Sequence, residues 1–261
     1  MIGMPSEKEL EEQELIFFAL RDTLMKEAET RGIMIRILGA IAFRIHCPIF
    51  KHYEYRAGRL LSDIDFAAYS RDKRKIEEMF SDLGYEIDKH AKFLFQGKRY
   101  IFYNPEGIHS DIFFDKLEMC HDVNFAERLE IDYPTISLAD LFFEKVQIVQ
   151  INEKDLIDTA VLLREHNVGP EDKETINSEY ISTVLSNDWG FWKTTTMNLE
   201  KISQYVKNAE FFQELDKKDI ISKIELLLKI IDDKPKSFSW KMRGRIGDKR
   251  KWYRDVEEFE R

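Results

Sequence analysis

Apolar residues recur along this chain with two different periods, and the change between them divides the sequence. From Glu7 to Thr30 apolar side chains return about every 3.6 residues between charged ones, which predicts one long helix ending near Gly32. Short β-branched runs follow, and these are typical of buried strands. From Ser137 the helical period returns and persists through most of the remaining chain. The pattern predicts an α+β protein with a helical C-terminal part.

Five segments between these helical regions are expected to be strands. They cover residues 33–38, 59–69, 85–87, 93–103 and 107–114. Helices are expected over 41–47 and over 71–83, where Gly84 has the place of a C-cap glycine. The sequence Asn104-Pro105-Glu106-Gly107 predicts a turn between the last two strands.

The C-terminal region is expected to consist of helices alone beyond Gly169-Pro170. That dipeptide predicts a boundary between a domain of residues 1–168 and a helical domain of residues 169–261. The aromatic cluster Trp189-Gly190-Phe191-Trp192 is expected in a turn between two helices. Packing in the core is the favoured interpretation of this cluster, and a platform that stacks bases is the alternative.

Composition excludes several classes of protein. No apolar run approaches the roughly 20 residues that a membrane span needs, so no membrane contact is expected. Residues 1–15 are acidic and lack the features of a secretory signal, which favours a cytoplasmic protein. Cys47 and Cys120 form neither a disulfide framework nor a zinc motif.

The net charge of −9 argues against a protein that wraps a long nucleic acid, but the charge is uneven. Between Lys234 and Arg254 there are nine Lys and Arg residues and one acid, Asp248. Residues 241–254, with interleaved aromatic side chains, are therefore a candidate for contact with RNA. The alternatives are a solvated helix that offsets an acidic body, or a seam against the acidic N-terminal helix.

Two aspartates interrupt the apolar run from Arg59 to Tyr69. Because strand side chains alternate, Asp63 and Asp65 project from one face and Ile64 from the other. Their Cα atoms are expected about 6.5 Å apart, so both carboxylates can converge on a cation. Like charges this close are unfavourable without a cation between them, which favours a metal site. An exposed strand end that serves solubility alone is the alternative.

Two further features strengthen the case for a metal site. Gly39-Ala40 is a strand-to-helix turn, where glycine lets backbone N–H groups approach a phosphate at the start of a helix. Asp111 and Asp115 lie in or beside a later apolar strand, and either could face a shared cleft. Three strand carboxylates and a glycine turn suit Mg²⁺ that bridges triphosphate oxygens.

As a set, these residues resemble the nucleotidyltransferase superfamily. Its pattern is a strand, a Gly-Ser or Gly-Gly turn, a short helix, a strand with Asp-x-Asp and a third Asp on a later strand. The matching residues here are Gly39-Ala40, Asp63-Ile64-Asp65 and Asp111. The sequence looks most similar to small prokaryotic nucleotidyltransferase-like proteins, including the AbiEii-type toxin group, through Lys145 and the acidic stretch 153–158. The resemblance covers roughly residues 33–165 and implies a mixed β-sheet flanked by helices.

The resemblance also implies an activity, the transfer of a nucleoside monophosphate from a nucleoside triphosphate to a hydroxyl group. Asp63, Asp65 and Asp111 would hold Mg²⁺ or Mn²⁺, and Asp111 would help to activate the acceptor. The residues expected at the nucleotide are Gly39, Ala40, Arg44, Arg59, Ser62 and Lys145. For the arginines and Lys145 the alternative is a surface ion pair or a side chain extended from an amphipathic helix.

Ala40 departs from the family pattern, which often has a serine after the glycine. This departure favours an alternative function, a non-catalytic protein of the same fold that binds a nucleotide or a partner protein, for instance as one half of a toxin–antitoxin pair. The acceptor in the catalytic reading is open, since a small molecule, a protein or a tRNA end each offers a hydroxyl group.

Overall fold

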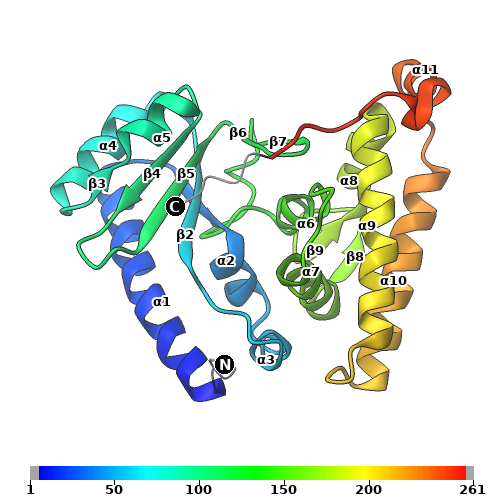
Figure 1. Ribbon diagram of the computed structural model, residues 1–261, viewed down its shortest axis with the longest axis horizontal. Coiled ribbons are helices and arrows are strands. Elements are labelled where there is room, and N and C mark those ends of the chain that lie inside the picture. Colours follow the sequence, from blue (N-terminus) through cyan, green and yellow to red (C-terminus); the bar gives the residue numbers. More distant parts are fainter. Residues whose placement is uncertain (1–5, 257–261) are drawn as a thin grey trace. The chain divides into compact units, whose positions relative to one another are not determined.

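The computed structural model describes residues 6–256, so the first five residues of the acidic N-terminal stretch lie outside the described part. The chain forms two compact units (Figure 1). The first, which we call the α/β unit, comprises Met1–Pro48, Tyr55–Leu117 and Asn124–Ser137. The second, the helical unit, comprises Ile49–Glu54, Glu118–Val123 and Leu138–Arg261.

A five-stranded mixed sheet forms the centre of the α/β unit. Its strands, in spatial order, are β1 (Ile35–Leu38), β2 (Asp63–Ala68), β5 (His109–Phe114), β4 (Arg99–Tyr103) and β3 (Glu86–Ile87). β2 and β5 are parallel, and the other neighbours are antiparallel. The helices are α1 (Glu7–Thr30), α2 (Gly39–His46), η1 (Ser70–Asp72), α4 (Lys73–Asp82) and α5 (Lys89–Leu94), and α3 (His52–Arg56) belongs to this unit only from Tyr55 onward. The predicted α+β class with a mixed sheet between helices is confirmed.

The first helix has the bounds that the sequence predicts, and local chemistry explains both ends. Ser6 caps the start of α1 in a capping box with Glu9, which satisfies two backbone donors. At the other end Gly32 has φ +61° and donates its N–H to the carbonyl of Glu29, which closes the last turn. Between these ends Leu10, Phe17 and Leu24 are buried.

The strand expected over residues 93–103 is only partly correct. Asp88 accepts a hydrogen bond of 2.8 Å from the N–H of Ala91 and so caps a short helix, α5, over the first part of this segment. Phe93, whose apolar side chain suggested a buried strand, is 85% exposed. Pairing with β5 begins only at Arg99, because the turn after α5 separates the two elements.

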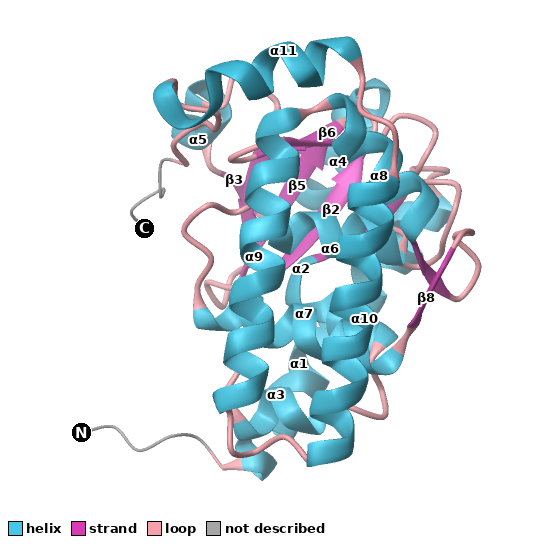
Figure 2. Ribbon diagram, turned by 90° about the vertical axis from the view of Figure 1, so that its right-hand side faces the viewer, coloured by secondary structure: helices cyan, strands magenta, loops and turns pink. Residues whose placement is uncertain are grey.

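The helical unit contains the remaining helices. These are α6 (Leu138–Val146), α7 (Glu153–Glu165), α8 (Ser178–Asn187), α9 (Trp189–Asn208), α10 (Glu214–Asp233), α11 (Phe238–Ile246) and η2 (Gly247–Lys249). Figure 2 shows α9 and α10 lying side by side as the two longest of them. Within residues 6–256 no helix is long and apolar enough to cross a membrane.

Two details of this unit differ from the sequence expectation. Beyond Gly169-Pro170, where helices alone were expected, the strand β9 (Thr175–Asn177) pairs with β8 (Asn167–Gly169). A second short pair, β6 (Lys116–Glu118) with β7 (Asp122–Asn124), precedes these helices in sequence. The Trp189–Trp192 cluster forms the first turn of α9, not a turn between helices, because Asp188 caps that helix through the N–H of Phe191 at 2.9 Å.

The compact units divide at Ser137, earlier than the domain boundary expected after residue 168. The reason is the packing of α6 and α7, which contact α9 and α10 of the helical unit. Phe143 of α6, for example, lies 4.7 Å from Phe191 of α9 between ring centroids. The division into compact units thus coincides with the change from strands to helices at Ser137, and the domain boundary after residue 168 stays a prediction.

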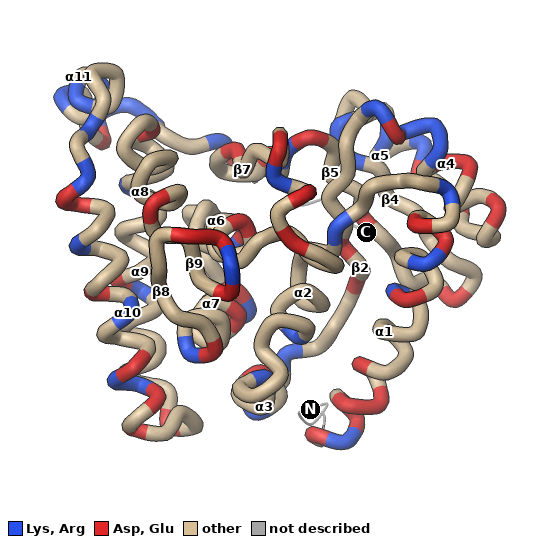
Figure 3. The backbone as a smooth tube through the Cα atoms, turned by 180° about the vertical axis from the view of Figure 1, so that it is seen from behind, with Lys and Arg blue, Asp and Glu red and all other residues tan. Residues whose placement is uncertain are grey.

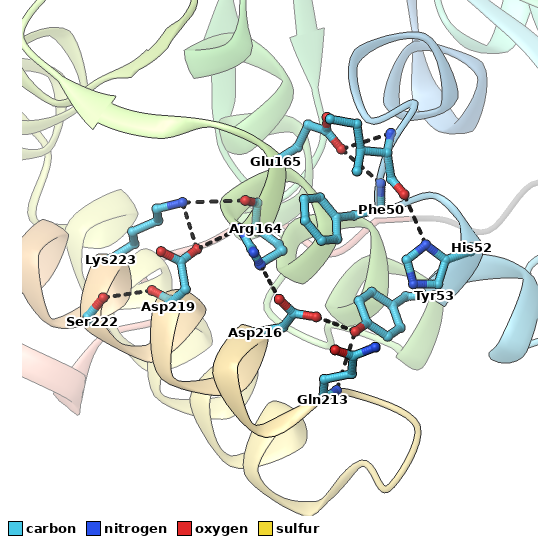
Figure 4. Close-up of polar contacts among 11 residues, drawn as sticks. Phe50, His52, Tyr53, Arg164, Glu165, Gln213, Asp216, Asp219, Ser222 and Lys223 are labelled. Carbon is cyan, nitrogen blue, oxygen red and sulfur yellow. Dashed lines mark hydrogen bonds and ion pairs between the residues drawn. The ribbon is translucent and has the colours of Figure 1, made fainter.

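Residues 49–54 belong to the helical unit although their neighbours in sequence belong to the α/β unit. Figure 4 shows how this segment is held. The Tyr53 hydroxyl donates to the Asp216 carboxylate, which also accepts a hydrogen bond of 2.6 Å from Nε of Arg164. The Arg164 guanidinium lies 4.0 Å from the centre of the Phe50 ring, and Glu165 accepts the N–H of Phe50 at 2.9 Å.

The hydroxyl of Tyr53 is fully buried, so we expect Tyr53→Phe to lower the free energy of unfolding. Loss of a hydrogen bond to a buried carboxylate costs about 1.5–3 kcal/mol, and Asp216 would keep only its arginine partner. Urea unfolding followed by circular dichroism measures the change. Tyr133→Phe is the control, since its side chain is 60% exposed. Equal stability of the two variants would contradict this role of Tyr53.

Candidate active site on the β2–β5 face

Three aspartates project from one face of the sheet at the parallel pair β2–β5. Asp63 and Asp65 share a face because alternate residues of a strand point the same way. In the β2–β5 register Asp65 is the partner of Asp111, and Asp63 is the partner of His109. Residues in register on neighbouring strands project to the same side, so the Asp111 carboxylate lies on the face of the other two.

The opposite face carries Ile64, Phe66 and Ile112, all fully buried. Phe102 of β4 also points to this side, where it stacks on Phe80 of α4 with ring centroids 4.2 Å apart. This apolar layer fixes the register of the strands, because a slip of one residue would turn the aspartates into the core. The polar face therefore depends on the packing of the apolar one.

The start of α2 lies against the Asp65 carboxylate. Leu38 is the partner of Asp65 in the β1–β2 register, and α2 begins at the next residue, Gly39. Gly39 has φ +71°, and a Cβ at this position would lie 2.3 Å from Oδ2 of Asp65. Only glycine satisfies both conditions, because any side chain would meet both a left-handed backbone and the carboxylate. The sequence predicted a turn here, but not this contact.

Two basic residues that sequence reasoning did not assign to the site lie beside the aspartates. The Arg99 guanidinium on β4 forms an ion pair with Asp111, which is 1% exposed. Nε2 of His109 lies 3.3 Å from Oδ2 of Asp63, whose side chain is 25% exposed. The signal that could have found Arg99 is its place at the start of an apolar strand that pairs with β5.

Aromatic rings hold Arg99 in this position. Its guanidinium carbon lies 5.1 Å from the centre of the Phe95 ring and 4.9 Å from that of Phe113. Contacts of this kind favour a cation over an aromatic face and limit where the guanidinium can move. Arg99 thus brings a fixed positive charge to the buried end of the aspartate cluster.

The side chains as they stand do not gather three metal ligands. Among residues 6–256 no group of three or more His, Cys, Asp or Glu side chains is close enough to hold one ion. Two of the carboxylates face basic groups, Asp111 at Arg99 and Asp63 at His109. The three aspartates share a face of the sheet, and Asp65 lies against Gly39 at the start of α2.

Ser62, Ala40 and Arg59 lie close in sequence to the aspartates or to Gly39. Ser62 is exposed and its hydroxyl donates to Oδ1 of Asp63 at 2.9 Å. Ala40 is buried in the first turn of α2, next to Gly39. Arg59 is buried, and one of its Nη atoms donates to the carbonyl of Leu60 at 2.6 Å.

Arg44 lies among protein partners, and its contact with a nucleotide stays a prediction. It is buried, its Nε lies 3.7 Å from Oε2 of Glu14 on α1, and its Nη2 donates to the carbonyl of Arg59 at 2.8 Å. Its guanidinium also covers the ring of Tyr55, whose hydroxyl donates to the same Glu14. Burial raises the pKa of the Tyr55 hydroxyl above its ordinary value. Arg44 thus joins α1, α2 and α3.

Lys145 lies in the helical unit, within a group of carboxylates. Its Nζ is 2.9 Å from Glu144, 3.6 Å from Asp155 and 3.3 Å from Asp158. The Lys145 and Asp158 side chains are buried, and a buried ammonium needs such partners to offset its lost hydration. Asp155 also completes a capping box with Asn152 at the start of α7.

Asp115 follows β5 and takes no part in the aspartate cluster. Its backbone has φ +63°, and its Oδ1 accepts a hydrogen bond of 2.9 Å from the N–H of Ser70. Its carbonyl accepts the N–H of Phe125 at 2.8 Å. These contacts give Asp115 a structural role in the chain that connects β2 to α4.

No protein-family model matches this sequence, and no curated protein matches it either. Among solved structures, the chain is similar to the solution structure of the antibiotic-resistance factor ANT(2″)-Ia. The match has a TM-score of 0.41 and 12% sequence identity, and it covers 66% of this chain and 95% of the other. The resemblance to nucleotidyltransferases and membership of the AbiEii-type group stay predictions from the sequence.

Proposed function

We propose that the α/β unit binds a nucleoside triphosphate with a divalent cation and transfers its nucleotidyl group to a hydroxyl acceptor. The observation that carries the proposal is the placement of Asp65. Asp65 is the partner of Asp111 in the β2–β5 register, and its carboxylate lies against Gly39 at the start of α2. An aspartate pair next to a helix start brings a cation and an anionic phosphate to the same point.

The donor set fits a hard divalent cation. Mg²⁺ and Mn²⁺ prefer carboxylate oxygens, and Asp63 and Asp65 present two carboxylates from one strand face. These two would hold the ion, and Asp111 would join them on release from Arg99. When bound, the ion would neutralise the triphosphate and polarise the bond to the α-phosphorus.

The protein's own groups would position the reactants. The first turn of α2, which has no side chain at Gly39, would receive phosphate oxygens on its backbone N–H groups. Asp111 would accept the proton of the acceptor hydroxyl, whose oxygen attacks the α-phosphorus while the bond to pyrophosphate breaks. Arg99, once separated from Asp111, would balance the charge that leaves with pyrophosphate.

A second candidate function is a non-catalytic protein of this fold that binds a nucleotide or a partner protein, as in a toxin–antitoxin pair. The ion pair between Arg99 and Asp111 favours it, because a guanidinium fixed between two aromatic rings can replace a metal ion as the counter-charge. Ala40, in place of the serine that is common in the family, favours it as well. Incubation with labelled nucleotides separates the two functions.

We expect Asp63→Asn with Asp65→Asn to weaken nucleotide binding in Mn²⁺ by at least about tenfold, since both proposed metal ligands lose their charge. Isothermal titration with ATP, GTP, CTP and UTP measures binding, and α-³²P-labelled nucleotides report transfer. Asp115→Asn is the matched control, because asparagine keeps the contact with Ser70 and the residue lies outside the cluster. If wild type binds none of the four nucleotides, the proposed function is wrong.

Gly39→Ala is expected to abolish metal-dependent nucleotide binding, because its Cβ would displace the Asp65 carboxylate. Gly58→Ala provides the control for backbone strain. Gly58 has φ +66° and nothing lies within 4 Å of its missing Cβ, so alanine there costs only the strain of about 1 kcal/mol. Equal nucleotide affinity of the two variants would contradict the role of the Gly39–Asp65 contact.

Arg99→Gln is expected to raise the affinity for Mn²⁺, since the ion no longer competes with a guanidinium for Asp111. Electron paramagnetic resonance of free Mn²⁺ measures the affinity without any nucleotide. Arg74→Gln, which removes an exposed arginine on α4, should leave it unchanged. An affinity that falls in Arg99→Gln would show that Arg99 supports the cluster instead of competing for it.

A further inference from the structure

The helical unit contains a cavity that the proposed reaction does not use. It has a volume of about 590 Å³ and lies between the β6–β7 loop, the start of α9, α11 and residues 250–254. A cavity of this size is in the range that accommodates a small ligand. Figure 3 shows basic residues along α11 and the chain that follows it, where the sequence had suggested contact with RNA.

The charge of the cavity wall is positive. Four basic side chains line it, namely Arg243, Arg250, Lys251 and Arg254, against the two acids Asp122 and Asp188. Both acids have partners of their own, since Asp122 pairs with Arg254 and Asp188 caps α9. Lys251 pairs with Asp255. The acids therefore do not balance the remaining arginines.

Arg243 and Arg250 face the cavity without an acidic partner among residues 6–256. Arg243 donates to the carbonyls of Gly247 at 2.8 Å and Arg250 at 2.6 Å, contacts that fix the guanidinium without neutralising it. The Cζ atom of Arg243 lies 4.7 Å from the centre of the Trp189 ring, which packs against one side of the guanidinium. A fixed guanidinium next to an exposed one is suited to phosphate oxygens.

Aromatic rings form another part of the wall. His121 stacks on Phe191 with ring centroids 5.0 Å apart and planes at 4°. Burial lowers the pKa of His121 to about 4, so this ring is neutral at pH 7 and adds no charge. Trp252 and Tyr253 are half-buried neighbours whose centroids lie 5.4 Å apart. Partly exposed rings beside cations are the combination that stacks bases while binding phosphates.

We propose that this cavity binds a nucleotide, either free or at the end of an RNA strand, with its phosphate on Arg250 and Arg243 and its base against Tyr253. The proposal does not depend on the aspartate cluster of the α/β unit. The basic C-terminal segment would then bind a nucleotide, whereas its composition alone is equally compatible with a solvated helix.

The test uses full-length protein with Asp63→Asn and Asp65→Asn in EDTA, so that the aspartate cluster contributes no metal-dependent binding. Three probes are titrated by fluorescence or calorimetry: AMP, ribose 5-phosphate and a single-stranded RNA of about ten nucleotides, enough to exceed one base-stacking site. Arg250→Gln is expected to weaken binding at least about fivefold, since it removes a charge-assisted hydrogen bond to phosphate. Lys249→Gln removes the same charge from the adjacent exposed residue, which lies outside the cavity. This variant should change the affinity for the probes less than about twofold.

Tyr253→Leu provides the second measurement. It should weaken binding of AMP or RNA and leave ribose 5-phosphate unchanged, because only the base contact is lost. If AMP binds, a free nucleotide is sufficient as the ligand of the cavity. If only RNA binds, the ligand is the end of an RNA strand. The proposal is overturned if no probe binds, if Lys249→Gln weakens binding as much as Arg250→Gln, or if Tyr253→Leu leaves nucleotide affinity unchanged.

Discussion

The contact between the Asp65 carboxylate and the start of α2 is the constraint on which the candidate site depends. Where a Cβ would stand at Gly39, an oxygen of Asp65 is 2.3 Å away, and the backbone there is left-handed. The apolar layer of Ile64, Phe66 and Ile112 keeps β2 and β5 in the register that brings Asp111 beside Asp65. The polar face is thus a consequence of how the buried face packs, and any change to the core that shifts the register would disperse the aspartates.

Arg99 and His109 lie against two of the three aspartates, Asp111 and Asp63. Three carboxylates on one sheet face would otherwise repel one another in a partly buried place. A divalent ion and a guanidinium are alternative solutions to that repulsion, and they lead to different functions. If a cation displaces Arg99 from Asp111, the site can be catalytic. If the ion pair persists, a binding protein of the same fold results.

Local patterns in the sequence predicted much of this arrangement. The alternation of Asp63-Ile64-Asp65 predicted their shared face, and the 3.6-residue period predicted the full extent of α1. What the sequence could not predict depends on partners far away in the chain. Arg44 forms an ion pair with Glu14, which lies 30 positions earlier in the sequence. Arg99 contacts Asp111 because β4 pairs with β5. Residues 93 and 94 are helical where the apolar pattern predicts a strand, because Asp88 caps the helix α5.

A crystal structure with Mn²⁺ and an α,β-methylene nucleoside triphosphate would locate the metal by the anomalous scattering of manganese. We expect a manganese peak bound by Asp63 and Asp65, Arg99 withdrawn from Asp111, and phosphate oxygens at the first turn of α2. A crystal in which the nucleotide or the manganese lies elsewhere, with Arg99 still paired to Asp111, would contradict it.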